Sequence, residues 1–365
     1  MQRADSKRNI QIELLRLVCC IMVIFNHTYN QFYYDGQGGL NWFPSIANLF
    51  NVCAVGCFLM ITGFFMFDGG FSYGKKLKKL VIDVLIPTAV VVVGIMLYRT
   101  IVGAQNMPFF LSLKNELENV MCQLLQWGFV GDYGYLWFIL SYVTIIVFYP
   151  VLYLVCKDTK EANIARRLLM GACLLNILAQ GFLSLVPTNF YISVFGLIDG
   201  NFLFVLIGYE MKLAYYKKHL LNYGGGVLLR KSAMYILSLA MLVSFTLLRY
   251  FEFGVDGLGW NNRYYFLYNI PVILCAVTMF DLFLHFEIRS VKISKIVLFL
   301  SSPTFFVYLV QSPLHGVRAA LMPYMYFVDN SFILGLFVTV VSFIVAKLFQ
   351  ICYTEVIKKC KKYIK

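Results

Sequence analysis

Charged side chains are scarce in this chain of 365 residues, since Asp, Glu, Lys and Arg together make up only 13% of it. A water-soluble domain is about a quarter charged and about half apolar, whereas 60% of this chain is hydrophobic. Apolar stretches of roughly 20 residues recur along the whole sequence, which is the pattern of membrane-spanning helices. The scarcity of charge therefore argues against a soluble domain and predicts an all-α, polytopic membrane protein.

Several short motifs of common protein classes are also missing. The sequence has no HExxH, no CxxC and no GxSxG, and its 4 histidines are dispersed. No zinc site and no serine-hydrolase nucleophile is therefore indicated. Most of the 10 cysteines lie inside apolar runs, where cysteine usually acts as a small packing residue. We therefore expect no metal and no disulfide framework.

We predict ten spans within a single transmembrane domain that covers residues 1–365. The first apolar run is interpreted as a retained span, because it carries Arg16 and lacks a small-residue cleavage site. The predicted spans lie near 10–33, 45–67, 80–101, 135–156, 168–186, 196–213, 232–250, 264–284, 296–314 and 331–353.

Basic residues alternate along the chain. Most of the 31 Lys and Arg fall in the two tails and in every second connection between spans. Among them are Arg166 and the four lysines of the basic loop predicted between the second and third spans. The positive-inside rule places both termini in the cytoplasm, and an even number of spans requires the same. The net charge of +13 is thus assigned to the inner membrane face and its anionic lipids, and not to nucleic acid.

Ionisable side chains interrupt the first apolar run, ELLRLVCCIMVIFNHTYN (residues 13–30). At 100° per residue, Arg16 and His27 share one helix face and lie about 16 Å apart along the axis. Arg16 would lie toward the cytoplasm and His27 toward the exterior. Ionisable groups inside a span are costly and commonly functional. A plainer alternative stays open, in which Arg16 reaches the inner interface paired with Glu13, and His27 is an ordinary interfacial residue.

The Arg-x10-His pattern of the first span resembles the hallmark of the acyltransferase 3 family of integral membrane O-acyltransferases. Other segments resemble motifs of the same family, in the same order, across nearly the whole chain. Two departures stand out: Gln311 replaces the usual His of the last motif, and the basic loop has Lys where Arg pairs are common. The similar segments are CFLMITGFF (57–65), KKLKKLVIDVLIP (75–87), YLWFILSYV (135–143), NFLFVLIGYEM (201–211) and SSPTFFVYLVQSPL (301–314).

The resemblance implies an O-acyltransferase, most often an O-acetyltransferase, of the bacterial cytoplasmic membrane. Such an enzyme moves an acyl group from cytoplasmic acyl-CoA to a hydroxyl of an extracytoplasmic cell-envelope polysaccharide or glycolipid. Acyl-CoA would be a donor co-substrate, and no cofactor would be bound permanently. The partners would be membrane lipid and a cell-surface glycan.

The resemblance implies a role for each candidate residue, taken here from the cytoplasmic side of the membrane to the exterior. Four lysines would attract the CoA phosphates, and Arg16 would hold the polar end of the donor deeper in the membrane. His27 would act as general base on the acceptor hydroxyl, or would itself carry the acyl group briefly. The four lysines are Lys75, Lys76, Lys78 and Lys79.

Further candidates lie elsewhere. Asp199 and Asn201 at the outer end of the sixth span, and Trp260 in an outer loop, could bind the acceptor sugar, although simple solvation at the interface also explains the first two. Glu210 is expected to face water near the inner surface. Apolar residues at helical spacing in 108–127 predict a helix on the outer surface.

Two other functions remain open. Ten spans with a buried arginine also suit a transporter or flippase of a small polar substrate such as an amino acid. The chain could instead be a catalytically idle subunit of a polysaccharide export system, although its possession of both Arg16 and His27 argues against that role.

Overall fold

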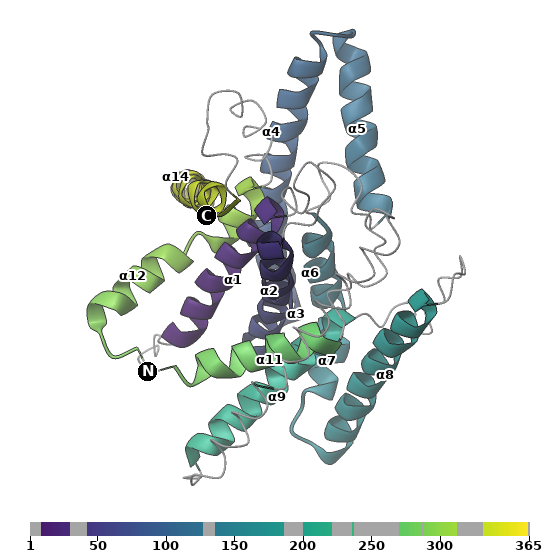
Figure 1. The fold of residues 1–365 in the computed structure, drawn as a ribbon, viewed down its shortest axis with the longest axis vertical. Coiled ribbons are helices and arrows are strands. Elements are labelled where there is room, and N and C mark those ends of the chain that lie inside the picture. Colours follow the sequence, from purple (N-terminus) through teal and green to yellow (C-terminus); the bar gives the residue numbers. More distant parts are fainter. Residues whose placement is uncertain are drawn as a thin grey trace. The chain divides into compact units, whose positions relative to one another are not determined.

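The computed structural model describes residues 9–29, 42–126, 136–185, 200–220, 236, 270–286, 288–311 and 331–363. Every regular element within these ranges is helical, which confirms the predicted all-α class for the described part of the chain (Figure 1). The elements are α1 (Ile10–Tyr29), α2 (Trp42–Met66), α3 (Tyr73–Leu80), the π-helical turn η1 (Val81–Leu85), α4 (Ile86–Gly103), α5 (Phe109–Gln126), α6 (Trp137–Val147), α7 (Tyr149–Val155), α8 (Lys160–Leu185), α9 (Gly200–Leu220), α11 (Ile270–Leu284), α12 (Val291–Ser301) and α14 (Ser331–Tyr363). A further short helix spans Thr304–Gln311.

Four of the described helices are long and apolar enough to cross a membrane, and two pairs of shorter helices would pass the same test if each pair crossed as one broken span. These 4 to 6 candidates support a multi-pass membrane protein. The predicted span 232–250 lies outside the described residues except for residue 236, and the count of ten and the cytoplasmic termini stay predictions. The single helices are Ile10–Thr28, Tyr73–Gly103, Lys160–Ala179 and Phe332–Cys360, and the pairs are Trp137–Val147 with Tyr149–Val155 and Val291–Ser301 with Thr304–Gln311.

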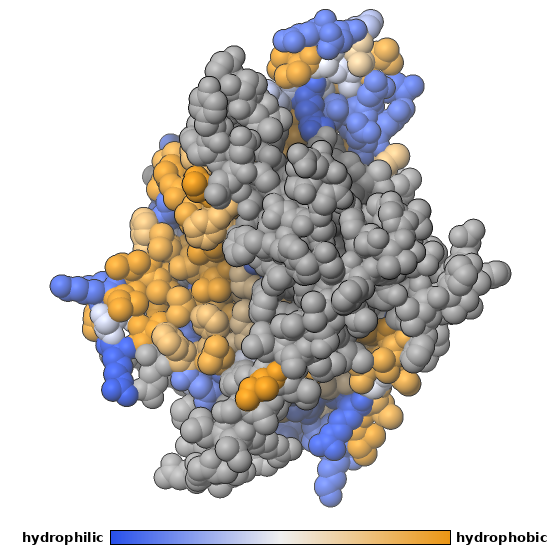
Figure 2. All heavy atoms as spheres, in the orientation of Figure 1, coloured by the Kyte–Doolittle hydropathy of each residue, from blue (hydrophilic) through white to orange (hydrophobic). Residues whose placement is uncertain are grey.

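Apolar side chains also cover part of the described surface. Figure 2 shows hydrophobic residues over the left of the view, around α12. On α4, Val90, Val93, Leu97 and Ile101 are exposed and recur at helical spacing. A water-soluble protein rarely exposes such a continuous apolar stripe, so this face of α4 suits contact with lipid.

The elements group into two compact units. Unit 1 comprises Met1–Gly69, Leu154–Ser302 and Asn330–Gly335, and unit 2 comprises Gly70–Tyr153, Pro303–Asp329 and Leu336–Lys365.

Unit 1 is built around the close packing of α2 against α9. A Cβ atom added at Gly63 of α2 would overlap the backbone of Val205, and one added at Gly208 of α9 would overlap the backbone of Met60. Small residues at a helix crossing let two backbones approach closely, which is a main source of helix association in membranes. Both glycines belong to segments that carry the family resemblance, so these motifs serve packing.

Unit 2 contains an antiparallel pair, α4 and α5, which lie side by side (Figure 1). The Ser112 hydroxyl donates to the Thr100 carbonyl at 3.1 Å and joins the two helices near their turn. Val120 of α5 is buried with Leu136 and Ile139 in the core of this unit. The helix predicted over 108–127 is thus confirmed, and its place at the outer surface stays a prediction.

The third predicted span begins earlier than expected, because α3, η1 and α4 form one continuous helix. The predicted basic loop is therefore wrong for its lysines, which lie on α3. Lysine and leucine are good helix formers, and no helix breaker stands between Gly74 and Pro87. The helix therefore continues from the lysines through η1 into α4, with no loop between them.

The π-helical turn η1 shows how this helix passes Pro87. The Ile86 amide donates to the Val81 carbonyl five residues back. In this register the next donor would be Pro87, which has no N–H, so the Ile82 carbonyl is left without a helical partner. The hydroxyl of Tyr353 in α14 donates to that carbonyl. A side chain 271 residues away therefore completes the helix.

We predict that Gly63→Ala and Gly208→Ala each lower the free energy of unfolding by about 1–3 kcal/mol, because the added methyl group must push two backbones apart. The measurement is the thermal unfolding midpoint in detergent. Gly94→Ala is the matched control, since nothing lies within 4 Å of that position, and the better helix propensity of alanine should leave the midpoint unchanged or raise it. Equal midpoints for the Gly63 and Gly94 variants would rule out the close crossing.

We predict that Tyr353→Phe costs about 1–3 kcal/mol of stability in the wild-type background, because it leaves the Ile82 carbonyl without a donor. In a Pro87→Ala background the chain regains a backbone N–H, and the same substitution should cost much less. Unfolding midpoints of the four proteins of this double-mutant cycle provide the check. An equal cost in both backgrounds would show that Tyr353 acts by packing alone.

Candidate functional site

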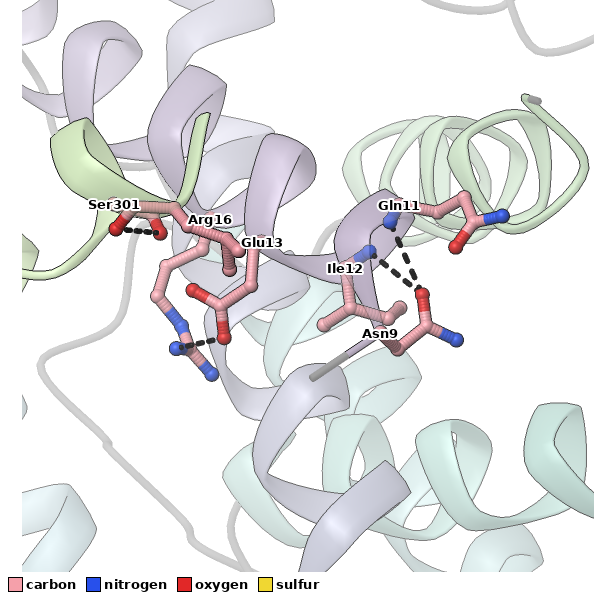
Figure 3. A network of polar contacts seen from close by, with 7 residues as sticks. Asn9, Gln11, Ile12, Glu13, Arg16 and Ser301 are labelled. Carbon is pink, nitrogen blue, oxygen red and sulfur yellow. Dashed lines mark hydrogen bonds and ion pairs between the residues drawn. The ribbon is translucent and has the colours of Figure 1, made fainter. Parts of the chain in front are cut away.

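The first turn of α1 is fixed by Asn9. Its side-chain oxygen accepts hydrogen bonds from the amides of Gln11 at 3.1 Å and Ile12 at 3.2 Å (Figure 3). Asparagine is a preferred N-cap because its oxygen satisfies amides that have no partner within the helix. The cap sets where α1 begins and so fixes the positions of Glu13 and Arg16 in the next turn.

Glu13 and Arg16 form an ion pair on α1. Arg16 Nη1 donates to Glu13 Oε1 at 2.8 Å, and the side chains are 7% and 29% exposed, respectively (Figure 3). The other carboxylate oxygen, Oε2, is buried and has no hydrogen-bond partner in the described part of the protein. The pair named in the plainer alternative therefore forms. It occupies only one of the five N–H donors of the guanidinium, so Arg16 keeps donors for a ligand.

Arg16 and His27 lie on a half-buried stripe of α1 that also contains Val23. Successive side chains on either side of this stripe are buried, and α2, α11 and α12 pack against α1. Buried side chains therefore border the stripe on both flanks beside Arg16 and on one flank toward His27. The buried neighbours are Ile12 and Cys19 on one flank and Glu13, Cys20 and Ile24 on the other.

Ser301 comes from a distant part of the sequence, at the end of α12, which packs against α1. It is buried, its hydroxyl donates to the Leu298 carbonyl at 3.5 Å, and Figure 3 draws it near Arg16. Ser301 opens the segment 301–314 that resembles the last family motif. Two motif segments from opposite ends of the chain thus meet at α1.

The C-terminal half of the stripe contains His27, which is half-buried one residue before buried Thr28. Two buried polar atoms lie on α1 and on α2, the helix packed against it. The side-chain oxygen of Asn26 and the side-chain nitrogen of Asn51, on α2, have no hydrogen-bond partner within the described residues. Buried polar groups are nearly always paired in native proteins, so groups that are not paired here are candidates for contact with a ligand.

The predicted donor-binding lysines belong to unit 2, whereas Arg16 and His27 belong to unit 1. Lys75, Lys78 and Lys79 are exposed on α3. The Lys76 ammonium lies 5.5 Å from the centroid of the Tyr149 ring, a cation–π contact. The helical backbone places the four cations on little more than one turn, which gives a concentrated positive surface.

The structure describes only some of the remaining candidate residues. Asn201 is buried in the first turn of α9, and Gln311 is buried at the end of the helix Thr304–Gln311. Asp199 and Trp260 lie outside the described residues.

One buried arginine was missed from the sequence. Arg166 is only 3% exposed and donates to Glu210 Oε1 at 2.6 Å. It also donates to the Val155 carbonyl at 3.0 Å and to Asn163 Oδ1 at 2.7 Å. Its guanidinium carbon lies 5.1 Å from the centroid of the Tyr209 ring. Arg166 thus joins α8 to α9 and to the end of α7.

The prediction that Glu210 simply faces water is therefore corrected, and Arg166, predicted in a basic connection between spans, lies within α8. Arg166 is buried, and the Glu210 carboxylate, although partly exposed, is held by its guanidinium. The sequence shows two adjacent arginines, Arg166 and Arg167, and nothing in it distinguishes the buried residue from the exposed one. The only sequence feature that hints at a buried arginine is the Glu210 carboxylate, which lies 44 residues later in a predicted span.

We predict that Arg166→Met lowers the free energy of unfolding by on the order of 2–4 kcal/mol, because it leaves several acceptors without their charged donor. Arg167→Met removes the same charge from an exposed neighbouring position and should change stability by less than about 0.5 kcal/mol. Chemical unfolding of the two purified variants in detergent measures the difference. Equal losses would show that the buried contacts contribute nothing beyond charge.

The comparison with protein families covers almost the entire chain. The Acyl_transf_3 family model, described as an acyltransferase domain, matches residues 9–349. No curated protein and no solved structure matches the chain. The matched region contains the Asn9 cap, the Glu13–Arg16 pair and His27, and it extends into α14. The chain therefore belongs to the acyltransferase 3 family of membrane acyltransferases.

Proposed function

We propose that this protein transfers an acyl group, acetyl in the simplest case, from cytoplasmic acyl-CoA to a hydroxyl of a cell-envelope polysaccharide or glycolipid in the bacterial cytoplasmic membrane. Membership of the family supports acyl transfer in general. The observation that carries the proposal is the half-buried stripe of α1, which presents a cation and an imidazole on one face of a helix whose neighbouring side chains are largely buried.

Arg16 would hold the acyl donor. Glu13 orients the guanidinium through a single hydrogen bond of 2.8 Å, which restricts its movement and leaves the other donors available. A guanidinium offers planar, paired donors that suit phosphate or carbonyl oxygens. Because Arg16 and His27 are separated by about 16 Å of helix rise, Arg16 would contact the donor at a distance from its thioester.

His27 would act at the reacting end. As general base, the neutral imidazole takes the proton of the acceptor hydroxyl while its oxygen attacks the thioester carbonyl. A C–O bond forms, the C–S bond breaks, and the CoA thiolate leaves and takes up a proton. If His27 carries the acyl group instead, its nitrogen attacks the thioester carbonyl and the C–S bond breaks as the CoA thiolate leaves. The acceptor hydroxyl then attacks the acyl-imidazole, the C–N bond breaks, and the hydroxyl proton passes to the released imidazole.

The acceptor sugar would bind near His27. The unpaired Asn26 oxygen and Asn51 nitrogen provide one acceptor and one donor for sugar hydroxyls. Asn201 stays a candidate for the same role, together with Asp199 and Trp260. A site built to bond a hydroxyl discriminates strongly against substrates that lack it, because its buried polar groups are then left unpaired.

We predict that the His27→Ala variant inserts and folds normally but transfers acyl groups about 10²–10⁴-fold more slowly. This factor is the usual contribution of a positioned general base. The measurement is mass spectrometry of envelope glycans from cells that carry each variant, together with transfer of label from acetyl-CoA in membrane vesicles. His285→Ala is the matched control, since this exposed histidine follows α11 and does not belong to α1.

Near-normal transfer by the His27 variant would contradict the assigned role. If vesicles with the wild-type protein accumulate an amino acid without acyl-CoA and label no glycan, the transporter alternative holds instead.

A further inference from the structure

An aromatic stack lies beside the lysines of α3, within unit 2. We define it as Phe71, Tyr149 and Tyr73. The rings of Phe71 and Tyr149 are 5.7 Å apart between centroids and 12° from parallel. The rings of Tyr73 and Tyr149 are 6.4 Å apart and 11° from parallel. Three rings from the segment before α3, from α3 itself and from α7 thus share nearly one orientation.

The stack is buried at its centre and open at one end. Tyr149 is 0% exposed, whereas Phe71 is 55% exposed. Tyr153 packs against Phe71 with centroids 5.3 Å apart and against Tyr149 at 5.7 Å. The Tyr73 hydroxyl donates to the Val147 carbonyl at 3.4 Å. Phe71 is therefore a supported ring whose free surface faces outward, which is the arrangement of a stacking platform.

One ammonium group of α3 contacts this stack, and the other α3 lysines follow Phe71 closely in the sequence. The Lys76 ammonium is 5.5 Å from the centroid of Tyr149, the ring behind Phe71. Lys75 is exposed four residues after Phe71, and Lys78 and Lys79 are exposed in the following turn. A planar aromatic surface and several ammonium groups are thus available to one ligand.

We propose that Phe71 binds the adenine of the acyl-CoA donor, whose phosphates the α3 lysines are expected to attract. Adenine stacks on the exposed face of Phe71, which Tyr149 supports from behind, and the ammonium groups contact the phosphates. Stacking of a base on an aromatic side chain contributes about 1–3 kcal/mol, and lysine binds phosphate as a point charge. This inference rests on the proposed function, because acyl-CoA carries this nucleotide.

Anionic lipid headgroups also bring phosphate to basic residues at a membrane surface. They contain no purine base, so they would bind the lysines and leave Phe71 without a specific partner. The stack and the lysines together therefore favour the nucleotide. Dependence of binding on the ring at position 71 separates these two sources of phosphate.

The first experiment measures binding without catalysis. In the full-length protein in lipid nanodiscs, Phe71→Trp introduces a reporter that adenosine 3′,5′-bisphosphate should quench saturably, relative to the parent protein. Phe110→Trp is the matched control, because Phe110 is 81% exposed on α5 and should not respond. Lys75→Gln combined with Lys78→Gln should weaken the quenching constant by about tenfold or more.

The second experiment uses two acyl donors. Phe71→Ala should raise the KM for acetyl-CoA by about 5- to 150-fold, the factor that corresponds to loss of one stacked base. It should leave unchanged the KM for S-acetyl-4′-phosphopantetheine, which lacks the adenosine part. Phe71→Tyr keeps an aromatic ring and should restore the KM for acetyl-CoA.

Opposite results would overturn the inference. An equal rise in KM for both donors would assign Phe71 a structural role only. A reporter that responds to phosphatidylglycerol vesicles and not to the nucleotide would assign the lysines to lipid. If the wild-type protein transfers no acyl group from either donor, the proposed function fails, whereas the fluorescence titration still reports whether the platform binds the nucleotide.

Discussion

Polar groups inside a bilayer have no water to bond to, so each must find a partner within the protein, and both units are organised by this constraint. In unit 2 the Ile82 carbonyl, which Pro87 deprives of a helical donor, receives the Tyr353 hydroxyl. In unit 1 the buried Arg166 distributes its donors over a carboxylate, an amide oxygen and a backbone carbonyl. These contacts connect segments far apart in the sequence and so help to determine which helices become neighbours.

Three exceptions to this constraint lie on the helix that carries the candidate site or on the helix packed against it. The second oxygen of Glu13, the amide oxygen of Asn26 and the amide nitrogen of Asn51 are buried without partners in the described part of the protein. An unpaired buried group costs about 1–3 kcal/mol, and such a cost is acceptable where a substrate later supplies the partner. The stripe of Arg16 and His27 thus has unpaired hydrogen-bonding groups near both of its ends.

The sequence was sufficient for the helical class, for the family and for the face shared by Arg16 and His27, because hydrophobic periodicity and motif order depend on local composition. It also predicted the Glu13–Arg16 pair, although only as part of the plainer alternative. It failed where a tertiary contact decided the outcome. Nothing local distinguishes buried Arg166 from exposed Arg167. The lysines were assigned to a loop because their segment resembles the family's basic loop before the third span, although lysine and leucine also favour a helix.

The two glycines of α2 and α9 were recognised in the sequence, but their role was not. Gly63 and Gly208 are visible in the sequence as members of family-like segments, yet their role in bringing α2 and α9 together becomes clear only when the two backbones are placed. Side-chain chemistry at one site and close backbone packing at another are thus both encoded in short motifs of similar appearance.

The π turn in η1 also controls the rotational alignment of the long helix. It contains one residue more than an α-helical turn would, and one residue corresponds to about 100° around the axis. The lysines of α3 are therefore rotated relative to the lipid-facing valines of α4 by an amount that an uninterrupted α-helix would not give. The direction in which the cations point therefore depends on this turn as well as on the positions of the lysines in α3.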